Sequence, residues 1–342
     1  MAASILTSGK VSAVLIDTIE GLEFVAAEWA SLCAADTAAT PFQSPHWLIP
    51  WVRHIWGGGQ LRALALRRDG RLVALAPLFL WGYGEGPVTV SLLGAGISDY
   101  SDMIALPEAA DAAAEAVFSW IDSSPEWDIC DFQDLRPASL LFRGESSESG
   151  VCPVLTLHTS MASQLSAADA NLRRSMRQAE KRLRAAGTVD FIRGDAENCE
   201  CLLDRLFELH TGRWQQRGES GMFSSSNLRT FHREAAARFA SAGMLRLYGL
   251  AVNSEVIAVQ YNFAAKGRVY AYQAGFDPAW SKSSPGSVLI AHSIEDAIAE
   301  GAHEFDFLRQ CEEFKYAWGA RETRIYRVVR RAARPATSLP AA

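Results

Sequence analysis

The sequence lacks the apolar stretches that mark a membrane-spanning or secreted protein. No uninterrupted apolar run approaches the roughly 18–20 residues that a membrane-spanning helix needs. The N-terminus, MAASILTSGKVSAVLIDTIE, lacks the charged segment and the long apolar segment of a secretion signal. The cysteines form no C-x-x-C pair and stand at positions 33, 130, 152, 199, 201 and 311. We therefore expect a cytoplasmic protein with reduced thiols and no membrane span.

The sequence also lacks an excess of basic residues. Its 33 Lys and Arg residues are outnumbered by 39 Asp and Glu residues, so the formal net charge is −6. A dedicated nucleic-acid-binding protein carries a basic face or domain, so we expect no nucleic-acid partner. No G-x-S-x-G, P-loop, dinucleotide-binding or H-E-x-x-H motif occurs. The histidines lack metal-ligand spacing, which predicts no metal site; they stand at positions 46, 54, 158, 210, 232, 292 and 303.

What is present is an ordinary globular composition. The chain has 342 residues, of which 49% are hydrophobic and 21% are charged. That length is sufficient for two domains of ordinary size. The C-terminal stretch RAARPATSLPAA is small, polar and Pro-containing. We therefore predict a disordered tail over residues 332–342.

Two segments of the chain resemble each other. LRALALRRDGRLVALAPLFL begins at Leu61, and LRLYGLAVNSEVIAVQYNFA begins at Leu245. Each reads as an apolar strand, a two-residue turn (DG or NS) and a second apolar strand, which is the pattern of a β-hairpin. The similarity indicates an internal repeat, with a chance likeness of two amphipathic hairpins as the alternative.

A second similarity follows in each half of the chain. EAVFSWIDSSPEWDICDF ends at Phe132, and IAHSIEDAIAEGAHEFDF ends at Phe307. Each reads as an amphipathic helix, a break and a strand that ends in Asp-Phe, so Asp131 corresponds to Asp306. Burying a carboxylate costs several kcal/mol unless it is paired or hydrogen-bonded. We therefore expect a structural role for this aspartate, such as pairing with Arg309 or capping the next turn, and keep a catalytic role as the alternative.

These patterns predict two copies of one α/β unit, with a seam near residues 137–160. In the first copy we predict helices near 21–35, 44–56 and 108–123, a hairpin at 61–80 and strands near 87–93 and 127–133. In the second copy we predict helices near 164–186, 197–217, 227–242, 286–300 and 311–318, a hairpin at 244–265 and strands near 268–275, 303–309 and 322–331.

The junction FDPAWSKSSPGSVLIAHSIEDAIAEG, from Phe276, is a candidate anion site. A strand ends near Gly275, a loop with Ser, Pro and Gly follows, and a helix begins about Gly286–Ser287. Free backbone N–H groups and the helix dipole favour an anion at such a start, and Gly286 permits close backbone approach. The alternative is an ordinary capped helix.

Two further stretches carry polar groups that have both a structural and a functional interpretation. NLRRSMRQAEKRLRAAG, from Asn171, is either a solvated helix face or a surface that attracts an anionic ligand. LHTGRWQQRGESGMF (209–223) ends a helix and enters a Gly-containing loop, where His210, Arg213 and Trp214 lie within about one helical turn. A packing role and a specificity role are both open for this segment.

Several ordered stretches are similar to those of a known family. They are PFQSPHWL (41–48), ISDYSD (97–102), RRSMRQAEKRL, LHTGRW, AYQAGFDPAWSKSSPGSVL and IEDAIAEGAHEFDFLRQCEEFKYAWG. From about Pro41 to Arg330 the chain resembles the CelD-type acetyltransferases of the GNAT superfamily, bacterial proteins often linked to cellulose or exopolysaccharide production. That family is related to the Fem-type transferases, which pair two GNAT-like domains.

The resemblance implies an α/β (α+β) fold of tandem GNAT-like domains, each a mixed, mostly antiparallel sheet flanked by helices. We place the N-terminal domain at 1–145 and the C-terminal acyltransferase domain at 155–331. The implied co-substrate is acetyl-CoA or another acyl-CoA, bound where GNAT folds bind the pyrophosphate. The residues at that place are Ser281, Lys282, Ser284, Gly286, Ser287 and Val288. The loop departs from the commoner Q/R-x-x-G-x-G/A pattern, since it has one Gly among serines.

The implied reaction is direct attack of a small-molecule amine on the thioester, with a hydroxyl acceptor as the alternative, and it needs a base, an oxyanion partner and an acid. The candidate catalytic residues are Asp306, Glu312, Tyr316 and Lys315, with Cys311 as a weaker nucleophile alternative. The candidate substrate-binding residues are His210, Arg213, Trp214, Phe223, Gln260, Tyr272, Asp99 and Tyr100.

The chain departs from the family's F-D-F-L-R-G-D-E-x-Y-K pattern at three positions, where it carries Gln310, Cys311 and Phe314. Two other functions therefore stay open. One is a Fem-type aminoacyl transferase that uses aminoacyl-tRNA, and the other is a non-catalytic GNAT-fold binding protein in exopolysaccharide assembly. The sequence leaves the acceptor, the acyl chain and the oligomeric state unassigned.

Overall fold

A computed structural model describes residues 4–8, 11–124, 126–195, 197–215, 218 and 221–332, with the backbone alone at 4–8 and 213–215. The chain divides into two units. Unit 1 is Met1–Gly150 with Arg324–Ala342, and unit 2 is Val151–Thr323. The last strand thus belongs largely to unit 1, whereas the predicted C-terminal domain ran to residue 331. Of the predicted tail, residues 333–342 lie outside the described residues.

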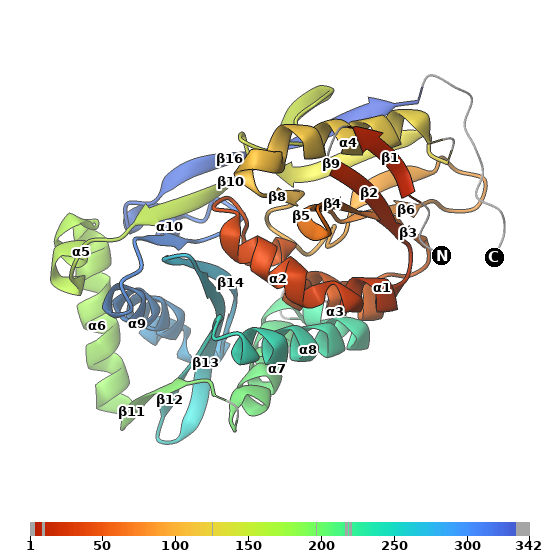
Figure 1. Cartoon of the computed structure of the whole chain (residues 1–342). Coiled ribbons are helices and arrows are strands. Elements are labelled where there is room, and N and C mark those ends of the chain that lie inside the picture. The colour runs from red at the N-terminus through yellow and green to blue at the C-terminus, as the bar shows by residue number, and fades with distance from the viewer. Residues whose placement is uncertain are drawn as a thin grey trace. The chain divides into compact units, whose positions relative to one another are not determined.

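Unit 1 contains two groups of hydrogen-bonded strands and four α-helices among its described residues (Figure 1). Its elements are β1 (Ser4–Ser8), β2 (Val11–Ile16), α1 (Ile19–Phe24), α2 (Ala26–Ala35), η1 (Pro41–Gln43), α3 (Pro45–His54), β3 (Gln60–Leu61), β4 (Ala63–Arg68), β5 (Arg71–Ala76), β6 (Leu78–Trp81), β7 (Thr89–Leu92), β8 (Ile104–Ala105), η2 (Pro107–Ala109), α4 (Ala110–Ser123) and β9 (Ile129–Leu135). One sheet has the order β1-β2-β4-β5-β8. The other group runs β9-β7-β6-β3, with the unit-1 part of β16 (Arg321–Arg331) beside β9.

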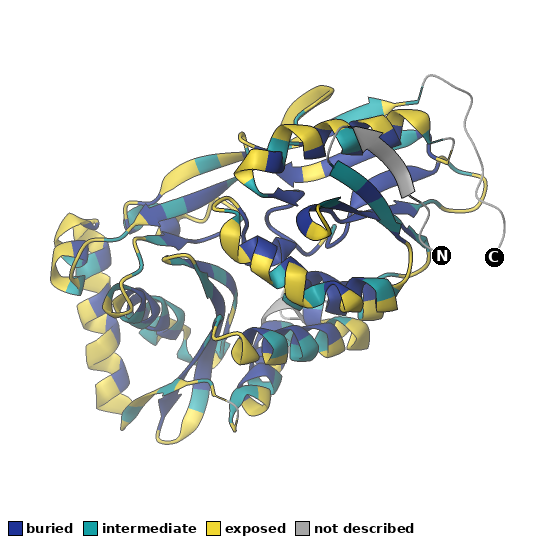
Figure 2. Cartoon of the chain, in the orientation of Figure 1, coloured by how far each residue is buried: buried dark blue, intermediate teal, exposed yellow. Residues whose placement is uncertain are grey.

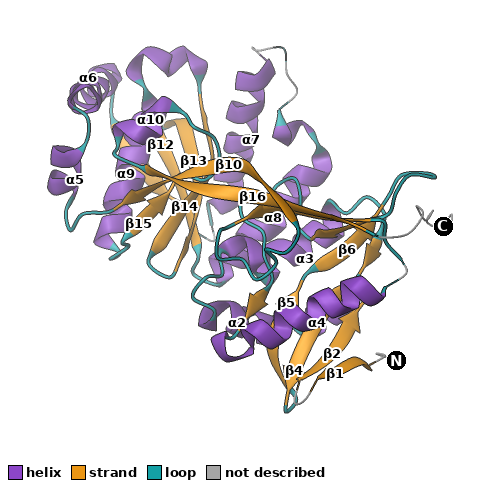
Figure 3. Ribbon diagram, turned by 90° about the horizontal axis from the view of Figure 1, so that it is seen from above, coloured by secondary structure: helices purple, strands orange, loops and turns teal. Residues whose placement is uncertain are grey.

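Unit 2 places a mixed sheet between helices. Its elements are β10 (Glu145–Thr156, shared with unit 1), α5 (Met161–Ala167), α6 (Ala170–Ala186), β11 (Val189–Arg193), α7 (Cys199–Gln215), η3 (Met222–Ser224), α8 (Ser226–Ser241), β12 (Leu245–Val252), β13 (Glu255–Ala265), β14 (Arg268–Phe276), η4 (Pro278–Ser283), α9 (Pro285–Ala299), β15 (Glu304–Asp306) and α10 (Glu313–Ala317). The strand order is β11-β12-β13-β14-β15-β10. Helix α9 lies on one face of β12–β14, and α7 and α8 lie on the other (Figures 1 and 3).

Both units repeat one arrangement, a helix between two parallel strands. In unit 1, α4 lies in the chain between β7 and β9, which pair in parallel at Thr89–Ile129. In unit 2, α9 lies between β14 and β15, which pair in parallel at Arg268–Glu304. The pairings of β10 with β15, β12 with β13, β13 with β14, β9 with β16 and β6 with β7 are antiparallel. The predicted fold class, two mixed and mostly antiparallel α/β units flanked by helices, is confirmed.

The two predicted hairpin turns are confirmed, with a positive φ at both central residues. Asp69 and Gly70 join β4 to β5, and Asn253 and Ser254 join β12 to β13. This backbone matches the twist of the flanking strands. The first hairpin is nevertheless shorter than predicted, because Pro77 separates β5 from β6 and β6 pairs in the other strand group. Proline has no N–H to continue a ladder.

The boundary between the units, at Gly150 and Val151, lies within residues 137–160, where the sequence predicts the seam. The same residues also form a strand that the sequence does not predict, since β10 occupies Glu145–Thr156. Its unit-2 half pairs with β15, at Val154–Asp306 and Leu155–Phe305. Strand formation here comes from this long-range partner rather than from local propensity.

Each unit has its own apolar core. In unit 1, one face of α4 packs against the sheets through Val117, Phe118 and Ile121. In unit 2, Leu289 and Ile294 of α9 join a second core with strands of its sheet. Figure 2 shows these helices with buried residues along the sheet-facing side and exposed residues outside.

Candidate functional site

The parallel pair in unit 2 separates at its carboxyl ends. Pairing of β14 with β15 reaches Tyr270 and Asp306, while β14 continues to Phe276 paired with β13. The β13–β14 register shifts so that Tyr261 opposes Gln273 and Asn262 opposes Ala271, which leaves Tyr272 as the extra residue of a bulge. A bulge bends a strand and ends regular pairing. From Ala271 onward, β14 makes no further ladder pairs with β15.

The helix that follows β14 begins with no side-chain cap. Ser284 is its N-cap residue, in the left-handed region at φ 46°, and makes no side-chain capping hydrogen bond. Pro285 stands at the first helical position and contributes no N–H. The first turn contains no acidic residue. The start of α9 therefore keeps the positive end of the helix dipole open to an anion.

Cations surround this helix start. Lys282 is exposed in η4, two residues before the N-cap residue. Arg182 of α6 donates from Nη1 to the backbone oxygen of Lys282 over 2.6 Å, which holds the basic helix against η4. Most of α6 is exposed around its Arg and Lys side chains (Figure 2). The basic stretch is thus both a solvated face and a source of positive potential at the predicted anion site.

The six donor-site residues predicted from the sequence stand together at this junction. Ser281 and Lys282 lie in η4, Ser284 is the N-cap residue, and Gly286, Ser287 and Val288 form the first turn of α9. A Cβ atom at Gly286 would lie 3.5 Å from Cδ1 of Phe276, an ordinary contact, so nothing within the fold requires glycine there.

Asp306 is buried, with 2% of its surface exposed, and it stabilises the turn that follows β15. Its Oδ1 accepts from the backbone N–H of Leu308 over 2.9 Å. Leu308 and Gln310 both have positive φ, at 56° and 80°. A bulky side chain in this region is strained, and such strain persists only where surrounding contacts hold it. This hydrogen bond caps the turn, which explains how the strand accommodates a buried carboxylate.

Lys315 holds the same turn from the other side. Its ammonium group donates to the backbone oxygens of Arg309 and Gln310, over 2.7 and 2.9 Å, and lies 2.8 Å from Oε2 of Glu312. The residue is 5% exposed. A buried ammonium is tolerated when it is paired and hydrogen-bonded. Its contacts suit a positioning residue for the 308–312 segment.

Glu312 and Tyr316 reach the surface beside this turn. Glu312 is exposed at the N-cap position of α10, and Tyr316 is partly buried within it. The Tyr316 hydroxyl donates to Oε1 of Glu322 over 2.9 Å. Desolvation, the hydrogen bond with Glu322 and the contact with Cys311 raise the pKa of Tyr316, so its hydroxyl keeps its proton at neutral pH. Cys311 is an exposed free thiol.

Several predicted substrate-binding residues lie in the interior of unit 2. Phe223 is fully buried against Phe207 and His210, and Tyr272 packs against Tyr261 and other rings. Gln260 is buried, and its Oε1 accepts from the Ser293 hydroxyl over 2.8 Å. These contacts are those of core residues. The side chains of Arg213 and Trp214 lie outside the described residues.

Asp99 and Tyr100 belong to unit 1 and are buried there. The Tyr100 backbone oxygen accepts from Gln43, and its ring lies 6.4 Å from that of Phe42. The described part of the chain holds no group of three or more His, Cys, Asp or Glu side chains that could bind a metal ion. None of its helices combines the length and the apolar character needed to cross a membrane.

The sequence similarity to known families falls on unit 2. Residues 170–316 match the family model described as Acetyltransferase (GNAT) domain. The matched segment contains α6, the β14–α9 junction and the turn after Asp306. The GNAT part of the resemblance is therefore confirmed for these residues. No curated protein sequence matches the chain.

Solved structures share the fold of the whole chain at low sequence identity. FemX is 12% identical with a TM-score of 0.62, over 88% of this chain and 95% of FemX. The C-terminal domain of a putative lysylphosphatidylglycerol synthetase from Agrobacterium fabrum is 11% identical with a TM-score of 0.54, over 90% and 91%. A tandem GNAT protein from the clavulanic acid biosynthesis pathway is 10% identical with a TM-score of 0.50, over 95% and 99%. These likenesses are to Fem-type and tandem GNAT folds.

Proposed function

We propose that unit 2 is an acyl-CoA-dependent N-acyltransferase of the CelD type, with acetyl-CoA as the first donor to test. The observation that carries the proposal is the GNAT match over residues 170–316 around a helix start with no side-chain cap, no acid in its first turn and Lys282 and Arg182 beside it. A diphosphate with two or more negative charges is the ligand such a start favours.

The residues fit an acyl-CoA in two places. The first turn of α9 provides the backbone N–H of Gly286 for the diphosphate, with Lys282 adding positive charge, whereas the Ser287 N–H already donates to the Ser284 backbone oxygen over 3.1 Å. The edge of β14 beyond Tyr270 provides backbone groups for the extended arm of the donor. The bound donor supplies an activated thioester carbonyl, and the chain supplies orientation and proton transfer.

The proton-transfer groups are assigned from exposure and contacts. Glu312 has an exposed carboxylate that takes a proton from the attacking amine, and Lys315 and Asp306 hold the turn that positions it. The nitrogen–carbon bond forms as the carbon–sulfur bond breaks. Tyr316, kept protonated by its raised pKa, donates the proton to the leaving sulfur.

The acceptor is proposed as a small-molecule amine, such as an amino sugar in exopolysaccharide or cellulose metabolism, and the site of action as the cytoplasm. The acceptor rests on the resemblance of the chain to CelD-type proteins, and the cytoplasm rests on the reading of the six cysteines as reduced thiols. A second candidate is aminoacyl transfer from aminoacyl-tRNA, favoured by the likeness to FemX and by the basic surface of α6. A third is a binding protein without catalysis, favoured by Gln310, Cys311 and Phe314 at positions where the family carries other residues.

Donor binding separates these candidates. Acetyl-CoA and CoA are each added to the full chain, and the melting temperature is followed; at 100 times Kd, binding stabilises by roughly 2.7 kcal/mol. Titration with aminoacyl-tRNA and with uncharged tRNA runs in parallel. Stabilisation by acetyl-CoA supports the first candidate, and preferential binding of aminoacyl-tRNA replaces it with the second. If neither acetyl-CoA nor aminoacyl-tRNA binds, the third candidate remains, which is a binding protein without catalysis.

Turnover then tests the proton-transfer groups, by release of free CoA thiol with an amine acceptor. Glu312→Gln and Tyr316→Phe are expected to lower kcat by about a hundredfold or more with little change in acetyl-CoA affinity. Asp306→Asn acts on the turn and is expected to lower kcat less than Glu312→Gln does. Full turnover by both Asp306→Asn and Glu312→Gln would show that the base has been assigned wrongly.

A further inference from the structure

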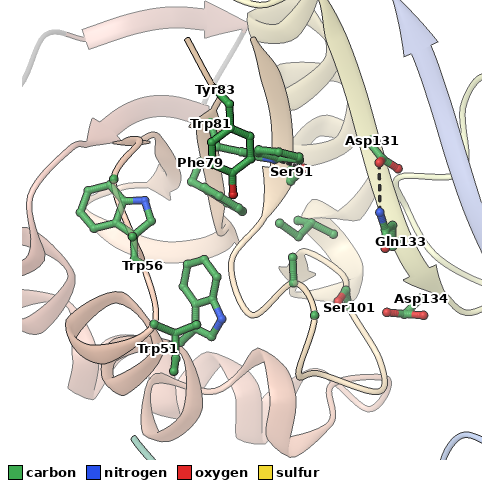
Figure 4. A pocket seen from close by; sticks show the side chains of 17 residues that line it. Trp51, Trp56, Phe79, Trp81, Tyr83, Ser91, Ser101, Asp131, Gln133 and Asp134 are labelled. Atoms are coloured by element: carbon green, nitrogen blue, oxygen red, sulfur yellow. Dashed lines mark hydrogen bonds between the residues drawn. The ribbon is translucent and has the colours of Figure 1, made fainter. Parts of the chain in front are cut away.

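Unit 1 contains a cavity that the proposed transfer chemistry does not use. It has a volume of about 370 Å³, within the range of small-molecule sites, and all of its lining residues belong to unit 1. It lies where β7 and β9 end, with Ser91 on one strand and Asp131 on the other (Figure 4). This is the place in unit 1 that corresponds to the separation of β14 from β15 in unit 2.

Aromatic side chains form one wall of the cavity. Phe79, Trp81 and Tyr83 alternate along β6 and the residues after it, so their side chains share one face. Trp81 and Tyr83 meet edge to face at 5.7 Å, and Trp51 of α3 meets Phe79 in the same way at 5.2 Å. Tyr83 is 83% exposed, which places an aromatic ring at the surface beside the cavity.

Two buried hydrogen-bond donors of this lining have no partner. The indole N–H groups of Trp51 and Trp56 are inaccessible and make no hydrogen bond, and Trp51 is 4% exposed. Both rings border the cavity, as Figure 4 shows. A buried polar group without a partner costs free energy, and in a native structure it calls for a specific explanation. Because neither N–H group is accessible with the rings in this position, a ligand oxygen accepts from them only after the rings turn toward the cavity.

The opposite side presents polar groups, and they are neutral or acidic. The Asp131 carboxylate accepts from Arg327 and from Gln133, and the Ser91 hydroxyl accepts from Trp81 and keeps its own proton to donate. Asp134 adds a second carboxylate to the lining. The described residues that line the cavity include no Lys or Arg. Ligands with phosphate or carboxylate groups are therefore disfavoured.

A saccharide ring matches this combination. Its C–H face packs on aromatic rings, and its hydroxyl groups both accept from indole N–H groups and donate to carboxylate oxygens. An ammonium ion offers no acceptor to Trp51 and Trp56, and an acyl chain offers no polar group at all. We propose that unit 1 binds a neutral or amino-sugar saccharide in this cavity. The inference stands apart from the transfer reaction of unit 2, since it needs no acyl donor.

The test measures saccharide binding to the full chain without any CoA. Saturation-transfer NMR and calorimetry are run with methyl glucoside, glucosamine and N-acetylglucosamine, and with the glucose and N-acetylglucosamine tetrasaccharides. Choline, benzyl alcohol and glucuronate are the comparison probes. We expect at least one neutral or amino saccharide to bind, and to bind more tightly than all three comparison probes. Tighter binding of a tetrasaccharide than of its monosaccharide identifies a polymer chain as the source, and equal affinity identifies a single ring.

Variants locate the binding. Trp51→Phe with Trp56→Phe keeps the aromatic rings and removes both donors, so saccharide affinity is expected to fall about tenfold. Tyr83→Ala, at an exposed position that leaves the core intact, is expected to weaken binding severalfold. Trp280→Phe makes the same ring exchange in unit 2 and is expected to leave saccharide affinity unchanged. Preference for choline or benzyl alcohol, no saccharide binding, or equal affinity in the wild type and the double variant each overturns the proposal.

Discussion

Unit 1 and unit 2 use the same strand–helix–strand arrangement, and their helix starts differ in charge. Helix α4 follows η2, and the acids Glu108 and Asp111 stand in the first turns of these helices. Helix α9 has no acid in its first turn and follows Lys282. Neither helix start has a side-chain cap. Carboxylates at a helix start already satisfy the dipole, whereas a cationic start attracts an anion. The comparison teaches that the proposed anion site is specific to unit 2, where the loop before α9 sets the charge, and does not follow from the shared fold.

The equivalent aspartates Asp131 and Asp306 show a related divergence. Both stand on a strand that follows the helix, opposite a residue of the antiparallel neighbour. Asp131 forms a two-hydrogen-bond pair with Arg327, with both distances at 2.7 Å, whereas Asp306 caps a strained turn. In both units the hydrogen bonds of this aspartate hold the local backbone or a neighbouring strand, and the partners differ between the units.

The largest expected effect comes from breaking the aspartate pair of unit 1. Arg327→Leu leaves a buried carboxylate without its cation and is expected to destabilise the chain by about 3 kcal/mol. Arg324→Leu, on the same strand, removes a pair with Glu148 in which both side chains are exposed and is expected to cost less than about 1 kcal/mol. Denaturant unfolding measures both, and equal losses for the two variants contradict a structural role for Asp131.

The two units are also expected to respond to pH in opposite directions. Burial, together with the charge of His210, lowers the pKa of His232 in unit 2 to about 3. Since the unfolded histidine titrates near 6.5, unit 2 loses stability as pH falls from about 6.5 toward 3. Desolvation raises the pKa of Asp102 in unit 1 to about 7, against the opposing hydrogen bond from Ser139. The stability that Asp102 contributes to the folded state is therefore full below about pH 3.8 and is lost as the pH rises toward 7.

Single variants separate these two responses. His232→Phe is expected to flatten the acid loss, and Asp102→Asn is expected to flatten the loss toward neutral pH. Each group contributes at most about 1.4 kcal/mol per pH unit. Unfolding free energies measured between pH 4 and 7 check both, and variants whose pH profiles parallel the wild type would contradict the assignment.

Reversing the charge of one residue tests whether the charge at the helix start sets the affinity for CoA. Lys282→Glu gives α9 the acid that α4 has, and the affinity for CoA is expected to fall about tenfold, with a weaker effect at high salt. Lys266→Glu makes the same reversal at the other end of β14 and is expected to change affinity far less. Equal effects from the two reversals indicate attraction by net charge rather than a site at α9.

The smallest expected effect on stability is at Gly286. Gly286→Ala has room within the fold, so stability is expected to rise by up to about 1 kcal/mol, while CoA affinity falls because the added methyl group faces the ligand. Gly212→Ala in α7, where a Cβ atom meets nothing within 4 Å, is the matched control and is expected to stabilise without changing CoA affinity. Unchanged CoA affinity in Gly286→Ala would contradict a close approach of CoA to the backbone at Gly286.

The sequence predicts features that depend on neighbouring residues. Pro285 and Gly286 mark the start of α9, and the DG and NS pairs mark the two hairpin turns. The correspondence of Asp131 with Asp306 also follows from the repeat and is found in the register of both units.

Features that depend on distant partners are not readable from the sequence. The polar run of β10 looks like a linker, and it becomes a strand only where it has a partner to pair with. Lys315 looks like a surface residue, and its burial comes from a turn in which Leu308 has positive φ. The partner of Asp131 is Arg327, far along the chain, and no local pattern indicates that pair.

Hydrogen exchange with and without CoA tests the central claim most directly, because one experiment reads both helix starts. The account predicts that CoA slows exchange of the backbone amides at 281–289, in η4 and the first turn of α9, and leaves 107–114 in unit 1 unchanged. Protection at the start of α4, or none at the start of α9 at saturating CoA, would contradict it.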